Sequence, residues 1–92
     1  MAKSILQSDK KCYVTGDTYS LHKHHVFGGG WRKLSEKWGC WVWLRSDYHN
    51  ASNHGVHSDH DLDMRIKKDA QKCFEELYGH ATFMQVFGKN YL

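Results

Sequence analysis

Six of the eight histidines of this chain fall into two groups whose residue types and spacing suit metal or proton chemistry. His22, His24 and His25 share one four-residue stretch, and three glycines follow shortly after it. The second group comes after an apolar segment and contains His49, Asn50, Asn53, His54 and His57. Neutral imidazole binds divalent transition metals and accepts a proton near neutral pH. The two groups therefore indicate a metal site, a proton-transfer site, or both.

Two adjacent histidines can divide these roles between them. One ring holds the metal, while its unligated neighbour takes a proton from water. In an extended strand, His24 and His25 point to opposite faces. Both rings reach one site only if the backbone is distorted near Gly28–Gly30, where glycine tolerates unusual angles. A polar surface run is the simpler alternative for such a pair.

Short strands and helices are expected to position the two groups. Strands are predicted over 19–27 and 40–45, with a third over 12–14. The predicted helices are a short one or a turn over 31–39 that Gly39 closes, one or two turns over 46–55, a long helix that Ser58 caps and Gly79 ends, and a last one over 81–88. This order predicts a small α+β domain, not the alternating order of a parallel sheet.

The periodicity of the apolar residues predicts which faces are buried. In strand 40–45, Cys40, Val42 and Leu44 share one face, and Trp41, Trp43 and Arg45 share the other. In the long helix, one stripe contains Leu62, Ile66, Ala70, Cys73 and Leu77. In the last helix, Phe83, Val86 and Phe87 are expected to pack inward. Trp31, beside the glycines, is expected to be the exposed tryptophan, with Trp41 or Trp43 buried.

Length, charge and cysteine content limit the kinds of protein that this chain can be. The 92 residues suffice for one domain over 1–92, with 1–11 as a partly frayed N-terminal segment. The net charge is only +3, but residues 1–37 carry seven basic and three acidic side chains, an excess that attracts phosphate. The three cysteines form no CxxC pair, so neither a cysteine zinc knuckle nor a disulfide framework is expected. No signal peptide or membrane-length apolar run is present, which favours a cytoplasmic setting.

The stretch "LHKHHVFGG…SEKWGCWVWLRSDYHNASNHGVH" resembles the HNH endonucleases, specifically the small phage-encoded ones. The resemblance covers roughly residues 12–78. It implies a ββα-metal (His-Me finger) fold, in which a β-hairpin and a short helix clasp one divalent ion, followed here by further C-terminal helices. It also implies metal-dependent hydrolysis of DNA phosphodiester bonds by a phage-encoded protein acting in the cytoplasm of its bacterial host.

The resemblance also assigns roles to the first three site residues. His24 is implied as a metal ligand, His25 as the general base and His49 as the second ligand. His24 and His49 are 25 positions apart, which is similar to the ligand separation in colicin-type nuclease domains. Because His25 must be neutral to accept a proton, activity is expected to fall in acid.

The remaining ligands are less closely specified. The colicin pattern places the third ligand at Asn53, where this chain departs from histidine, and His54 and His57 are the alternatives. We favour His57, because "GVH" leads into the long helix and can turn the ring toward the site. Asn50 corresponds to the family's central asparagine, or that role is lost in this chain.

The resemblance implies DNA as the partner and one divalent ion as the cofactor, with no organic cofactor. Mg²⁺, Mn²⁺, Ni²⁺ and Zn²⁺ are candidates, although histidine ligation suits zinc, nickel or cobalt better than magnesium. The candidate phosphate contacts are Arg32, Lys33, Lys37 and Arg45, each equally interpretable as an ordinary surface base. Cutting both strands would require a homodimer or a phage protein partner.

Two non-catalytic hypotheses compete with the nuclease. One is a structural metal domain that binds nucleic acid or protein without cutting, with a closed four-coordinate site. The unligated His25 beside a ligand argues against it, because a purely structural site has no use for a free base. The other is a degenerate family member that acts as an interaction or inhibitor protein, consistent with a lost asparagine.

Overall fold

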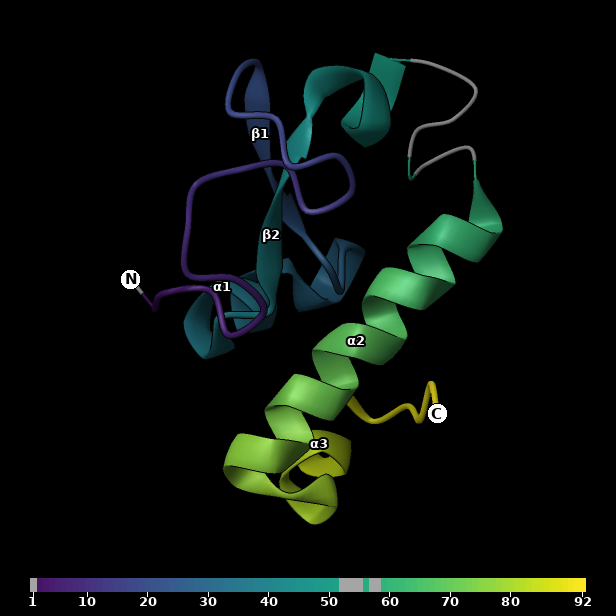
Figure 1. Ribbon diagram of the computed structural model, residues 1–92. Coiled ribbons are helices and arrows are strands. Elements are labelled where there is room, and N and C mark those ends of the chain that lie inside the picture. Colours follow the sequence, from purple (N-terminus) through teal and green to yellow (C-terminus); the bar gives the residue numbers. More distant parts are fainter. Residues whose placement is uncertain (1, 52–55, 57–58) are drawn as a thin grey trace.

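Two antiparallel strands and a long helix form the frame of the molecule (Figure 1). The structure is a computed structural model that describes residues 2–51, 56 and 59–92. Strand β1 (Leu21–His25) pairs with β2 (Trp41–Arg45). The helical elements are η1 (Gly29–Trp31), α1 (Arg32–Trp38), the π-helical turn η2 (Asp47–Ala51), α2 (His60–Tyr78) and α3 (His80–Phe87). The predicted α+β class is confirmed.

The register of the two strands decides which histidine is buried. His24 lies opposite Val42, and His25 lies opposite Trp41. Because directly opposed residues share a face, His24 joins the buried face and is 5% exposed. On β2 the predicted alternation is confirmed, since Val42 and Leu44 are fully buried. Trp31 is exposed and Trp41 is largely buried, also as predicted.

The N-terminal segment lies along the outer edge of β2, contrary to the expectation that it frays. Ser4 Oγ donates to the Trp41 carbonyl at 2.6 Å, and the Trp43 N–H donates to Gln7 Oε1 at 2.6 Å. The Tyr13 N–H donates to the Trp43 carbonyl at 2.8 Å. Residues 13–15 form a turn, and the strand predicted over 12–14 is not present. The segment therefore satisfies edge groups of β2 that would otherwise need water or another chain.

Gly39 joins α1, β2 and this N-terminal segment. It caps α1 with a left-handed φ of +75°, and its carbonyl accepts from the Ile5 N–H at 2.9 Å. A Cβ at this position would overlap the Lys3 carbonyl oxygen.

We expect Gly39→Ala to lower the free energy of unfolding by about 1–3 kcal/mol, measured by denaturant titration. Gly16→Ala is the control, because Gly16 has φ +81° but open space around its Cβ position; an equal loss in both would contradict a cost from the overlap.

Helix α2 differs from its sequence prediction in its N-cap residue and in the C-terminal part of its buried face. Its N-cap is Asp59, whose side chain accepts from the Leu62 N–H at 3.1 Å; the predicted cap, Ser58, lies outside the described residues. Ile66 and Ala70 are buried as predicted, but Leu77 is 60% exposed and Phe74 takes the core position instead. Ile66, Ala70 and Phe74 follow one another at intervals of four residues, so they lie on one face of the helix. The predicted stripe instead continued to Cys73 and Leu77.

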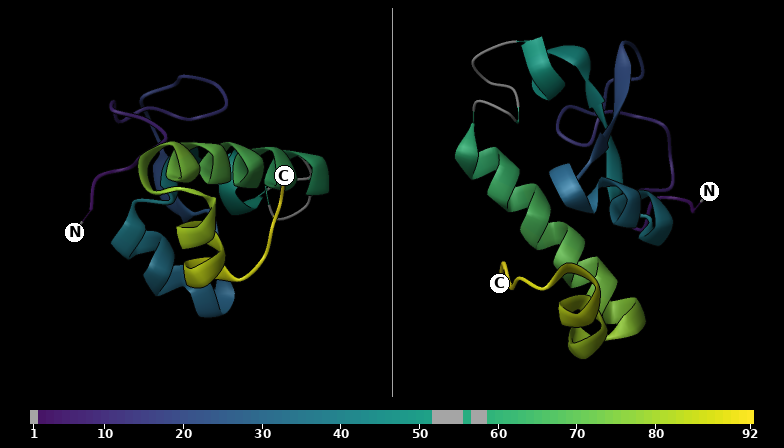
Figure 2. Two further views of the ribbon diagram at one scale, coloured as in Figure 1. Left: turned by 90° about the horizontal axis from the view of Figure 1, so that it is seen from below. Right: turned by 180° about the vertical axis from the view of Figure 1, so that it is seen from behind.

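The aromatic core fixes the chain segment that follows β1. Phe27, directly after that strand, packs on Phe83 and Phe87 with ring centroids 5.6 and 4.5 Å apart. Phe74 packs on Phe83 at 5.4 Å and on Trp38 at 5.3 Å. Figure 2 shows α3 folded back against α2, and Phe83 of α3 contacts Phe74 of α2. The end of β1, where His25 lies, is therefore anchored by a buried cluster.

The cysteines are free, as the sequence predicts. Cys12 and Cys40 are buried, and burial raises the pKa of the Cys40 thiol to about 12. Both act as small apolar core residues. In the described part of the chain, no helix is both long and apolar enough to cross a bilayer.

Candidate functional site

His24 and His49 meet between β1 and η2, although they are far apart in the sequence. Their ring centroids are 5.4 Å apart, with an interplanar angle of 68°. His22, which is not among the predicted ligands, also contacts His49, with 3.3 Å between the two Nδ1 atoms. The alternation that puts His22 and His24 on one strand face was the available signal for this third ring. The strand pair and η2 thus gather three imidazoles at one place.

The position of η2 depends on Arg45, at the end of β2. Its guanidinium forms a forked ion pair with Asp47, at 2.6 and 2.8 Å, and a further pair with Asp17. Hydrogen bonds to Asp47, and then to Asp17, raise the Arg45 pKa above its usual value. Arg45 was predicted as a phosphate contact, but each of its three guanidinium nitrogens donates to a carboxylate in this structure. Its observed role is to hold the start of η2, and so His49, beside β1.

The predicted third ligands lie outside the described residues. These are Asn53, His54 and His57. Asn50 belongs to η2, but the placement of its side chain is also outside the description. Within residues 2–51, 56 and 59–92, no three His, Cys, Asp or Glu side chains are arranged to hold a metal. Of the three predicted ligands, the structure therefore describes His24 and His49 and leaves the third outside the description.

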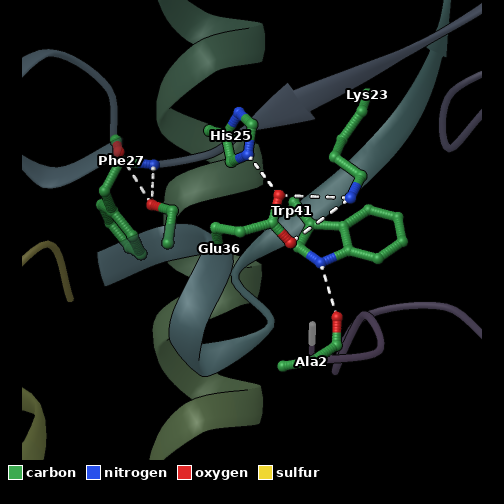
Figure 3. A network of polar contacts seen from close by, with 7 residues as sticks. Ala2, Lys23, His25, Phe27, Glu36 and Trp41 are labelled. Carbon is green, nitrogen blue, oxygen red and sulfur yellow. Dashed lines mark hydrogen bonds and ion pairs between the residues drawn. The ribbon is translucent and has the colours of Figure 1, made fainter. Parts of the chain in front are cut away.

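His25 lies on the opposite strand face and contacts Glu36 of α1 (Figure 3). Its Nε2 is 3.0 Å from Glu36 Oε1, and its side chain is 13% exposed. Lys23 Nζ lies 3.2 and 3.3 Å from the two Glu36 oxygens and 4.1 Å above the Trp41 ring. The hydrogen bond with His25, and then the contacts with Lys23, lower the Glu36 pKa. Sequence reasoning missed Glu36, although Lys23 and His25 on one strand face favour an acidic partner.

A pocket of about 590 Å³ unites the two strand faces at the end of β1. Its titratable and charged lining residues are Lys23, His24, His25, Arg32, His49, His60, Asp63 and Lys67. Gly28 and Gly29, just after β1, also line the pocket, whereas His24 and His25 keep regular strand pairing and no distortion of β1 is present. The far wall is the first part of α2, where Lys67 pairs with Asp63 at 2.8 Å.

Of the predicted phosphate contacts on α1, only one lines this pocket. Arg32, at the start of α1, is exposed and lines it. Lys33 and Lys37 are exposed on the same helix but do not line the pocket. Lys67 and His60 were not predicted, because only the packing of α2 across from β1 brings them to the site. The pocket thus has basic side chains from two helices, Arg32 of α1 and Lys67 of α2, with Asp63 paired to Lys67.

Comparison with protein-family models, with curated proteins and with solved structures finds no match for this chain. The functional conclusion therefore depends on the residues and on their geometry.

Proposed function

We propose that this chain is a metal-dependent DNA endonuclease of the HNH type, with the ββα-metal arrangement formed by β1, β2 and η2. The observation that carries the proposal is the meeting of His24, His25 and His49 at one pocket, despite their positions on two strand faces and on a separate turn. The basic side chains of Arg32 and Lys67 suit a phosphodiester backbone.

His24 and His49 are the side chains that would hold the ion. The residues fit this role, because a buried imidazole and a half-buried one meet edge to face at the pocket wall, with ring centroids 5.4 Å apart. Imidazole ligands favour zinc, nickel or cobalt over magnesium. Asn53, His54 and His57 remain the candidates for a third ligand. When bound, the ion supplies Lewis-acid stabilisation for the negative charge that develops on the phosphate and the leaving oxygen.

His25 is the proposed general base. It removes a proton from water as the water oxygen bonds to phosphorus and the bond from phosphorus to the 3′ oxygen breaks. The 3′ oxygen takes a proton from solvent, so the products carry a 5′-phosphate and a 3′-hydroxyl. Arg32 and Lys67 attract the phosphate backbone and orient it over the three histidines.

Incubation of the purified protein with supercoiled plasmid tests this proposal. Separate reactions contain Mg²⁺, Mn²⁺, Ni²⁺ or Zn²⁺, each with a chelator control. We expect nicked plasmid with at least one ion and none with chelator. His80→Ala is the matched histidine control, because His80 lies on α3, 57% exposed and paired with Glu75. Tight metal binding without any cleavage would instead favour the structural metal domain, and neither binding nor cleavage would favour the interaction protein.

Arg32 supplies a separate prediction about DNA binding. Arg32→Gln is expected to weaken binding to all DNA sequences alike and to reduce the salt dependence by about one counterion. Lys37→Gln is the control, since Lys37 lies outside the pocket on the same helix. Fluorescence anisotropy over a salt series measures both quantities. An equal loss in the two variants would mean that general surface charge, rather than this pocket, attracts DNA.

A further inference from the structure

We propose that Glu36 fixes the tautomer of His25, so that the neutral ring carries its proton on Nε2 and presents Nδ1 as the atom that accepts a proton from water. Glu36 is then a positioning residue that acts through His25. The role of Nδ1 rests on the proposed nuclease function, whereas the tautomer is a property of the metal-free protein.

The chemistry of the two side chains decides which nitrogen of His25 carries the proton. A carboxylate only accepts hydrogen bonds, and a neutral imidazole has one N–H and one lone pair. The Nε2 to Oε1 separation of 3.0 Å is a hydrogen bond only when Nε2 carries the proton. The lowered pKa of Glu36, caused first by this hydrogen bond and then by Lys23, supports an ionised carboxylate at neutral pH. Nδ1 is then the basic atom of the ring.

Two further contacts hold Glu36 in place for this role. Lys23 Nζ lies 3.2 and 3.3 Å from its two oxygens, which restricts rotation of the carboxylate. The preceding residue, Ser35, is fully buried; its Oγ donates to the Phe27 carbonyl at 2.7 Å and accepts from the Phe27 N–H at 3.1 Å. Helix α1 is thereby fastened to the chain two residues after His25.

The orientation of the ring agrees with this assignment. Figure 3 shows the second ring nitrogen of His25 on the side away from Glu36. His25 lines the pocket, but Glu36 does not. The carboxylate thus lies behind the ring, as the orienting acid does behind a catalytic histidine in a triad.

A purely structural role for Glu36 makes a different prediction. An ion pair that only joined α1 to β1 would affect stability, and the position of the His25 proton would not depend on it. The measurement must therefore report on the proton itself. Long-range ¹H–¹⁵N spectra of ¹⁵N-histidine-labelled, metal-free protein distinguish a protonated ring nitrogen from an unprotonated one, in a buffer alkaline enough to keep imidazole neutral. Comparison with His25→Ala assigns the signals.

We expect the wild-type spectrum to show His25 protonated on Nε2. In Glu36→Gln, whose amide either donates or accepts, both tautomers are expected, and the cleavage rate falls about 10–100-fold with metal affinity unchanged. Lys23→Gln keeps the carboxylate and is expected to keep the wild-type tautomer. A proton on Nδ1 in the wild type, or an unchanged tautomer in Glu36→Gln, would overturn the inference.

The outcomes separate this inference from the proposed function. If the wild type has the expected tautomer but cuts no DNA, the nuclease proposal fails and Glu36 still controls the ring. If the wild type cuts DNA with the proton on Nδ1, the nuclease proposal stands and the role of Glu36 fails. The wild-type spectrum alone decides the tautomer if Glu36→Gln does not fold.

Discussion

His25→Ala is expected to lower the rate of DNA cleavage by about 10²–10⁴-fold, the usual cost of losing a general base. Metal binding is expected to persist, because His25 faces Glu36, on the opposite strand face from His24. The combination of lost turnover with retained metal is what distinguishes a base from a ligand. Single-turnover nicking of supercoiled plasmid measures the rate, and calorimetric titration measures metal affinity.

His80→Ala controls for the loss of a histidine elsewhere, since the His80 side chain is 57% exposed on α3. Circular dichroism checks that both variants remain folded, because the His25 side chain is only 13% exposed. Full cleavage by His25→Ala would remove this residue from its proposed role. Loss of cleavage together with loss of metal would make His25 a ligand instead.

His49→Ala is expected to abolish measurable metal binding, with a loss of affinity above about 100-fold, and to reduce cleavage to background. Loss of a ligand lowers metal affinity more than loss of a residue that only orients a ligand, for which a decrease of about 10–100-fold is usual. His49 is the better ligand to remove, because it is half-buried, whereas truncation of the buried His24 would also leave a cavity. Calorimetric titration with Zn²⁺ and with Ni²⁺ measures the effect.

His22→Ala is the matched control for this experiment. His22 is exposed on β1, and its Nδ1 lies 3.3 Å from His49 Nδ1, but the proposal gives it no ligand role. We expect His22→Ala to bind metal like the wild type. If it loses binding as completely as His49→Ala, then His22 belongs to the ligand set and the assignment of His24 must be revised.

The local features of the fold were predictable from the sequence because each depends on neighbouring residues. The alternation in β2, the closure of α1 at Gly39 and the inward packing of Phe83 and Phe87 all follow from short-range periodicity or backbone geometry. The approach of His24 to His49 was predicted from the resemblance, and from a strand that ends near His25 and a helical turn that starts near His49. The finer ββα-metal assignment stays a proposal.

The contacts that depend on packing between distant segments were not predictable. Glu36 reaches His25 only because Ser35 fastens α1 to Phe27, and nothing in the local pattern specifies that crossing. Lys67 enters the pocket only through the position of α2. Arg45 was assigned to phosphate because charge pattern alone does not reveal that Asp47, two residues later, binds it.

The claim on which the account depends is that His24 and His49 hold one divalent ion beside His25. A crystal structure of the protein grown with Zn²⁺, with anomalous data on both sides of the zinc edge, tests it most directly. The account predicts an anomalous peak in the pocket at about 2.0–2.1 Å from a ring nitrogen of both His24 and His49, with His25 unligated. Zinc bound elsewhere, or a pocket without an anomalous peak at saturating Zn²⁺, would contradict it.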